Sequence, residues 1–109
     1  MITDDEVESA VEFLRTGGRK AAKARAERIY MEEYRKVVKA KIMRERESLA
    51  IGAQERDAYS DPRYVEHLNA MRTAIENDEF HLWALVAAQA KIEAWRTQQS
   101  NARSLGKLE

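Results

Sequence analysis

The sequence lacks cysteine and contains little proline, glycine or aromatic residue. Without cysteine, a disulfide framework, a cysteinyl zinc site, a thiol nucleophile and a cysteine-ligated iron–sulfur cluster are all excluded. One proline and four glycines exclude collagen-like and Pro/Gly-rich disordered classes. The longest apolar run, residues 82–88, is about a third of the roughly 20 residues that a membrane span requires. The N-terminus is acidic and carries no targeting pattern, so we expect a soluble cytoplasmic protein with no membrane partner.

Good helix formers dominate what is present. The 109 residues fit one domain, and 35% charged residues with a mean hydropathy of -0.67 leave little apolar surplus for a compact globule. We expect an all-α fold: a short N-terminal helix followed by a long antiparallel two-helix, coiled-coil-like hairpin. We place this single helical domain at residues 1–107 and interpret residues 108–109 as the scar of an affinity tag.

Capping signals place the first helix at about residues 4–16. Thr3 and Glu6 have the spacing of a capping box, and the acids that follow Thr3 oppose the positive end of the helix dipole. Gly17 and Gly18 then predict its end.

A second helix is predicted at about residues 19–57, with a bend near Gly52. Its apolar residues are predicted to form one inner face at 3.6 residues per turn. They are Ala22, Ala26, Ile29, Tyr30, Tyr34, Val37, Val38 and Ala40.

A third helix is predicted at about residues 62–100, because Asp61 can cap a helix whose first residue is Pro62. We expect it to continue past Asn77 and Asp78. Its heptad-like stripe packs on the second helix, and a further apolar line occupies a different face, which indicates cover by a second chain, as in a two-fold dimer. The predicted oligomer interface consists of Phe80, Trp83, Ala87, Ala90 and Ala94.

Positive charge gathers in one block although the net charge is zero. Residues 1–14 carry five acids and no base, whereas residues 19–46 carry eleven bases and four acids. Basic side chains on the predicted outer face of the second helix have a spacing that suits a phosphate backbone. These candidate nucleic-acid ligands are Arg25, Arg28, Arg35, Lys36, Lys39 and Arg46. The alternative is a solvated face that keeps a long helix soluble or receives the acidic first helix.

No catalytic constellation emerges. His67 and His81 are fourteen residues apart, about 21 Å along one helix, which is too far to share a metal ion within one chain. The serines lack a nucleophile elbow, and residues 16–20 lack the second half of a phosphate-binding loop. We expect no enzyme activity, no catalytic residue, no metal and no cofactor.

Three stretches carry a resemblance to a known family. They are the run Ala24-Arg25-Ala26-Glu27-Arg28-Ile29-Tyr30 with Glu33-Tyr34-Arg35-Lys36, the run Ala53-Gln54-Glu55-Arg56-Asp57-Ala58-Tyr59 with Pro62, and the run Ala87-Ala88-Gln89-Ala90-Lys91-Ile92-Glu93-Ala94-Trp95-Arg96. Together they resemble a family of small helical proteins of bacteriophages and prophages without an assigned activity, over about residues 20–105. The resemblance implies a bacterial host cell and an association with phage replication and recombination genes. It implies no role for any single residue.

Two functional hypotheses follow. The first is a non-enzymatic, dimeric phage-type accessory protein that binds DNA without reading its sequence, or binds a phage replication or recombination protein. The alternative is a protein–protein interaction and oligomerisation module that binds no nucleic acid and uses the apolar patch around Phe80 and Trp83.

Overall fold

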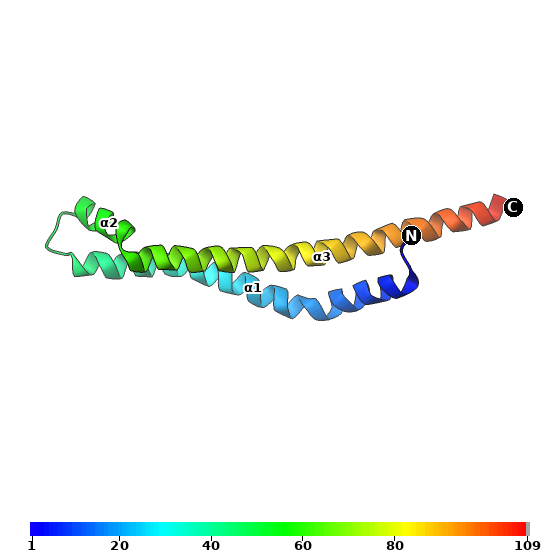
Figure 1. Cartoon of the computed structure of the whole chain (residues 1–109), viewed down its shortest axis with the longest axis horizontal. Coiled ribbons are helices and arrows are strands. Elements are labelled where there is room, and N and C mark those ends of the chain that lie inside the picture. Colours follow the sequence, from blue (N-terminus) through cyan, green and yellow to red (C-terminus); the bar gives the residue numbers. More distant parts are fainter. Residues whose placement is uncertain (109) are drawn as a thin grey trace. The chain divides into compact units, whose positions relative to one another are not determined.

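The computed structural model describes residues 1–108, which form three helices and contain no strand (Figure 1). Helix α1 spans Asp4–Glu45, α2 spans Ile51–Ser60 and α3 spans Pro62–Leu108. The predicted all-helical class is confirmed. None of the helices described is long and apolar enough to cross a membrane. Of the predicted tag scar, Glu109 lies outside the described residues.

Two compact units make up the described chain. The terminal unit contains residues 1–22 and 80–108, and the central unit contains residues 23–79. Helices α1 and α3 each contribute a segment to both units, whereas α2 belongs to the central unit alone. The expectation of one helical domain over residues 1–107 stays a prediction.

Two of the three predicted helix starts, at Asp4 and at Pro62, are confirmed. The hydroxyl of Thr3 accepts a hydrogen bond from the backbone N–H of Glu6 at 3.2 Å, and α1 begins at the next residue, Asp4. The carboxylate of Asp61 accepts a bond from the N–H of Arg63 at 2.8 Å, and α3 begins at Pro62. Arg63 also pairs with Asp61 and Glu45, and its hydrogen bonds lower the pKa of both carboxyls. The end of α1 is thereby tied to the start of α3.

The predicted end of a first helix at residue 16 is wrong. Helix α1 runs through Gly17 and Gly18 without a break, and no glycine of the described chain has a positive φ. The preference of glycine for helix ends is only about 1 kcal/mol per residue, so packing of the same helix face on both sides of the pair outweighs it. Gly17 lies in that packed face: a Cβ there would come within 3.5 Å of Leu85.

The predicted second helix over residues 19–57 is also wrong, since the chain leaves α1 at Glu45. Hydrogen bonds from Arg46 N–H to the Met43 carbonyl, and from Leu49 N–H to the Arg46 carbonyl, turn the chain before α2 starts. This break comes earlier than the bend predicted near Gly52, and it folds α2 back toward α1 and α3. Beyond residue 100, α3 continues to Leu108, past its predicted end, and no kink interrupts it at Asn77.

The core of the central unit forms where its three helices meet. Ile42 of α1 is 1% exposed and Ala58 of α2 is fully buried, and both lie against Tyr64 of α3. Val38 and Met43 pack around this cluster. A ten-residue helix is marginal on its own, so burial of Ala58 in this cluster is what stabilises α2.

In both units the buried and half-buried positions recur at spacings of three and four residues, with one gap of seven in α1 between Met31 and Val38, which is the pattern of a coiled-coil seam. The seam of the central unit consists of Ala24, Arg28, Met31, Val38 and Ile42 of α1, with Tyr64, His67, Met71, Ala74 and Asp78 of α3. The seam of the terminal unit consists of Val7, Ala10, Leu14, Gly17 and Ala21 of α1, with His81, Leu85, Ala88, Ile92 and Trp95 of α3.

Polar contacts show that the segments of α1 and α3 run antiparallel within each unit. In the central unit, the ring of His67 hydrogen-bonds the Met31 carbonyl at 2.7 Å, whereas Glu45, later in α1, meets Arg63, earlier in α3. In the terminal unit, the Trp95 indole donates to Asp4 at 3.1 Å. The amide side chain of Gln98 there bonds both backbone groups of Ile2.

The uninterrupted path of α1 predicts the effect of Gly18→Ala. No atom lies within 4 Å of a Cβ built at Gly18, so alanine adds helix propensity without a clash. We expect the free energy of unfolding, measured by urea titration, to rise by about 0.5–1 kcal/mol. A loss of stability would instead indicate a helix end at the glycine pair.

Candidate interaction surfaces

The apolar face predicted to be the inner face of the second helix is mostly exposed. Ile29 is 46% exposed and Tyr30 is 59% exposed, and Val37 is exposed as well. Val38 does pack against the core, but for most of these residues the prediction is wrong, because the buried stripe of α1 runs along the other side of the helix and contains Arg28. A long basic side chain can bury its methylene groups while its charged group forms an ion pair. The spacing of apolar residues alone therefore does not identify such a position as buried.

Arg28, a predicted phosphate ligand, lies inside the central unit. Its side chain is 27% exposed, and its Nη1 lies 2.9 Å from Oδ2 of Asp78, a buried residue of α3. Glu32 and Glu79 lie farther away, at 3.7 and 4.0 Å, and the buried Nε makes no hydrogen bond. A charge pair at this position of the seam fixes which residues of α1 and α3 lie opposite each other.

Lys39 and Arg46 attach α2 to α1. The ammonium group of Lys39 donates to the Tyr59 hydroxyl at 2.8 Å and lies 3.7 Å from the Glu55 carboxylate. The bond to Tyr59, together with the charge of Glu55, raises the pKa of Lys39. Arg46 lies 3.7 Å from Asp57. These two side chains therefore already have partners within the chain.

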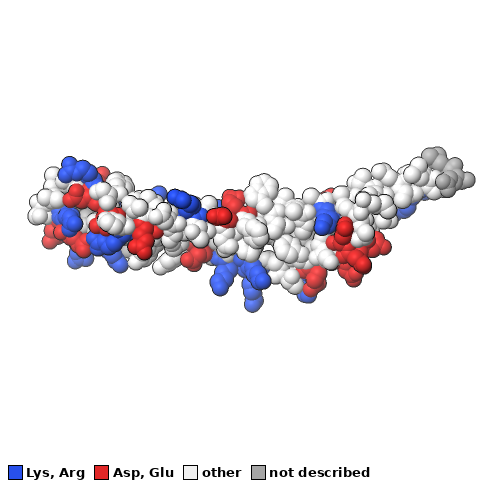
Figure 2. All heavy atoms as spheres, in the orientation of Figure 1, with Lys and Arg blue, Asp and Glu red and all other residues white. Residues whose placement is uncertain are grey.

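Among the predicted nucleic-acid ligands, Arg25 and Arg35 keep their charge exposed. Within the part of the chain that the structure describes, neither has an ion pair or a side-chain hydrogen bond, whereas Lys36 pairs with Glu33 at 3.1 Å on the surface. In Figure 2, blue and red spheres are mixed over the region around α2. The basic ridge predicted along one helix is thus mostly divided into local ion pairs.

The predicted oligomer interface lies exposed on α3 in the terminal unit. Phe80 is 68% exposed and Trp83 is 63% exposed, and Ala87, Ala90 and Ala94 are exposed too. We call these five residues the aromatic–alanine face. The seam residues of the same helix, such as Ala88, face α1 instead. Helix α3 therefore has two apolar sides here, and its own chain covers one.

No charged residue interrupts this part of α3. From Phe80 through Ala90 the sequence contains no Asp, Glu, Lys or Arg, and Leu82 and Val86 add further exposed apolar surface. Beside the aromatic–alanine face lies an open groove of about 550 Å³ between α1 and α3. Its apolar walls come from Ala10 and Phe13 on one side and from Ala84, Ala87 and Ala88 on the other.

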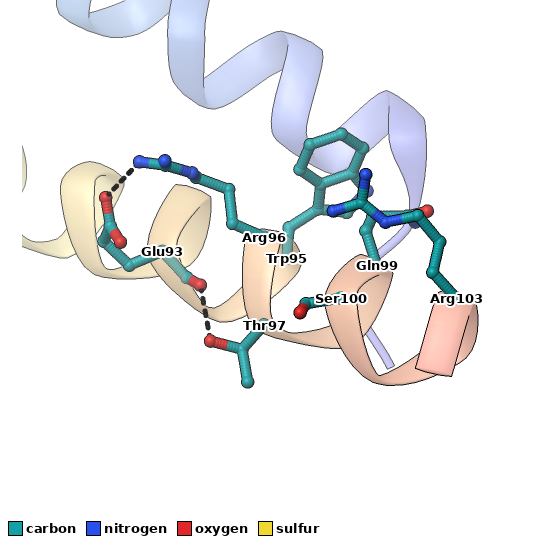
Figure 3. Close-up of a pocket in the computed structure, with 7 residues that line it drawn as sticks. All are labelled: Glu93, Trp95, Arg96, Thr97, Gln99, Ser100 and Arg103. Carbon is teal, nitrogen blue, oxygen red and sulfur yellow. Dashed lines mark hydrogen bonds and ion pairs between the residues drawn. The ribbon is translucent and has the colours of Figure 1, made fainter. Parts of the chain in front are cut away.

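A second hollow, of about 640 Å³, follows α3 near its C-terminal end (Figure 3). In Figure 3 the Trp95 side chain points toward the ribbon of α1, while Arg96 turns back to Glu93, 3.1 Å away. Thr97 donates to the backbone carbonyl of Glu93 at 3.2 Å. These polar groups serve α3 itself, and no nucleophile lies beside a base in this hollow.

The two histidines belong to different units. His67 hydrogen-bonds within the central seam, and His81 contacts the ring of Phe80. Over residues 1–108, no three His, Asp or Glu side chains converge in the arrangement that a metal ion requires.

Comparisons of the chain with protein-family profiles, with curated proteins and with solved structures give no match.

The Arg28–Asp78 pair predicts unequal effects of single and paired substitutions. Asp78→Ala leaves the guanidinium of Arg28 half-buried without its closest partner, so we expect a loss of about 1–3 kcal/mol in unfolding free energy. Replacing both residues by leucine should cost less than the single change, because no charge then remains in the seam. Thermal unfolding followed by circular dichroism provides the comparison, and a loss below about 0.5 kcal/mol for Asp78→Ala would contradict a structural role.

Proposed function

We propose that the chain is a non-enzymatic protein-interaction module that self-associates through the aromatic–alanine face. The observation that carries this proposal is the exposure of Phe80 and Trp83 on a stretch of α3 without charge. Contiguous exposed apolar patches rimmed by polar residues are rare on monomers and mark interaction sites, and buried aromatic side chains supply most of the binding energy of such sites.

A second copy of the chain accounts for this surface with the fewest additional assumptions. Closed two-fold dimers are the commonest soluble assembly, and in them one patch meets the same patch of the other copy. Paired helical hairpins that form a dimer would extend the antiparallel packing seen within each unit. We therefore propose, as the sequence predicts, that the chain forms a dimer and that each copy contributes a long two-helix hairpin.

Loss of the aromatic side chains should weaken the assembly. We expect Trp83→Ala and Phe80→Ala each to raise the dissociation constant about 30-fold, which corresponds to about 2 kcal/mol for a central aromatic contact. Sedimentation velocity over a concentration series measures the constant.

The matched control is Tyr30→Ala, an aromatic residue of similar exposure in the central unit, which should leave association unchanged. Circular dichroism checks that all variants keep their helicity. A monomeric mass for the native chain throughout the series would overturn the proposal.

Nucleic-acid binding is the second candidate function, and Arg25 and Arg35 favour it because their exposed guanidinium groups have no partner within residues 1–108. They lie ten residues apart on α1, about 15 Å, which allows contacts to neighbouring phosphates. Three further expectations stay predictions: a phage-type role in DNA metabolism, a phage protein as the partner, and a location in the cytoplasm of a bacterial host.

The double variant Arg25→Glu with Arg35→Glu tests this candidate without breaking an ion pair of the fold. If these residues contact phosphates of double-stranded DNA, fluorescence anisotropy should show weaker binding by the variant than by the native protein. The binding constant of the native protein should also fall more steeply with salt concentration, by the slope that about two phosphate contacts contribute. The control variant, Arg72→Glu with Arg103→Glu, carries the same change in net charge. Absence of binding by native protein at micromolar concentration and about 50 mM salt would eliminate the candidate.

A further inference from the structure

Helix α2 lies on a segment of chain whose two ends are held together by one arginine. Arg63 of α3 pairs with Glu45, the last residue of α1, and with Asp61, the residue that follows α2. The segment between these two acids, residues 46–60, contains α2 and the turn that precedes it. Helix α2 can therefore detach while the end of α1 stays tied to the start of α3.

The remaining contacts of α2 are weak for a helix. Among residues 51–60, all of which the structure describes, only Ala58 is buried. Ala50, at the N-cap, makes no side-chain cap bond, and α2 has no acid in its first turn and no base in its last. Gly52 lowers its helix propensity further. A ten-residue helix with these properties is expected to unfold locally before α1 or α3 does.

Helix α2 covers positive charge. The ammonium group of Lys39 lies 3.7 Å from the Glu55 carboxylate and 4.6 Å from the centre of the Tyr59 ring, and the Lys39 side chain is 27% exposed. Arg46 lies 3.7 Å from the Asp57 carboxylate. Both carboxylates belong to α2, and both cations belong to the basic block of residues 19–46. The carboxylates thus give these cations the negative charge that phosphate groups of a ligand would otherwise supply.

The covered cations continue the line of charge that Arg25 and Arg35 begin. Arg35 and Lys39 are four residues apart on α1, about 6 Å, so they lie on the same side of the helix. Arg46 directly follows the last residue of α1. Without α2, Lys39 and Arg46 would join Arg25 and Arg35 as cations open to solvent. Each further phosphate contact strengthens the binding of DNA at low salt.

From these contacts we infer that α2 is an autoinhibitory cover, which double-stranded DNA displaces by competing with the α2 carboxylates for Lys39 and Arg46. The inference is independent of self-association and rests on the second candidate function, the binding of DNA by Arg25 and Arg35. The open form has the higher affinity for DNA, so DNA shifts the equilibrium toward it. The apparent affinity of the native chain is reduced in proportion to the fraction of molecules that are open.

Two kinds of variant release α2 by different means. The double variant Glu55→Gln with Asp57→Asn removes both carboxylates and changes side-chain size little. Ala58→Gly removes a buried methyl group and weakens the helix without any change in charge. We expect each to bind double-stranded DNA about five- to ten-fold more tightly than the native protein, because each raises the open fraction. Fluorescence anisotropy at about 50 mM salt measures the affinities, and circular dichroism checks that α1 and α3 stay helical.

The matched control is Glu66→Gln with Glu76→Gln. It makes the same change in net charge as the double variant, at exposed carboxylates of α3 that form no ion pair within residues 1–108. Since it leaves α2 in place, its affinity for DNA should stay within about two-fold of the native value.

Hydrogen exchange of the backbone amides gives an independent readout of α2 itself. Residues 51–60 should exchange faster than the buried segments of α1 and α3 in the native protein. Saturating double-stranded DNA should accelerate exchange in residues 51–60 by about three-fold or more, because it holds the chain in the open form. A ligand that bound without displacing α2 would leave this exchange unchanged or slow it.

The outcomes separate the cover from the candidate function on which it rests. If neither the native protein nor the released variants bind DNA, both are overturned. If the native protein binds DNA through Arg25 and Arg35 but the released variants bind no more tightly than the control, the cover alone is overturned. Exchange in residues 51–60 that does not accelerate on DNA binding overturns the cover as well.

Discussion

The structure depends on the fact that a helix of α3's composition has more apolar surface than one neighbouring helix can cover. In the terminal unit, Leu85, Ala88 and Ile92 lie in the seam with α1, whereas Phe80 and Trp83 project from a different side. Burying a Trp or Phe side chain is worth a few kcal/mol, so this exposed surface represents binding energy that the single chain does not use. The proposed self-association follows from this excess.

A second constraint determines where the basic residues end up. A seam of small and apolar residues permits several registers, but a charge pair inside it favours one. Arg28 and Asp78 form such a pair in the central unit, and Lys39 and Arg46 hold the short α2 in place. Three of the eleven basic residues in this block, Arg28, Lys39 and Arg46, therefore hold the helices of the fold together. This is why protein interaction ranks above nucleic-acid binding as the proposed function.

The sequence predicts the parts of this structure that are local. Thr3 and the Asp61-Pro62 pair mark two helix starts because a cap depends on residues within one turn. The same kind of reasoning fails at Gly17 and at residue 45, where packing between segments distant in the chain outweighs propensity. It also predicts the wrong buried face of α1. Arg28 lies on the buried face, although a prediction from apolar residues alone places an arginine in solvent. The aromatic–alanine face was accessible from sequence, since its two lines of apolar residues are both local features of one helix.

The most direct test of the account is the fluorescence of Trp83 in a chain whose other tryptophan is replaced, Trp95→Phe. The account predicts a blue-shifted emission at high protein concentration, where the second copy covers the indole, and a shift to the red on dilution as the dimer dissociates. An emission typical of a water-exposed indole at every concentration would contradict the claim that this face is covered by another molecule of the same chain.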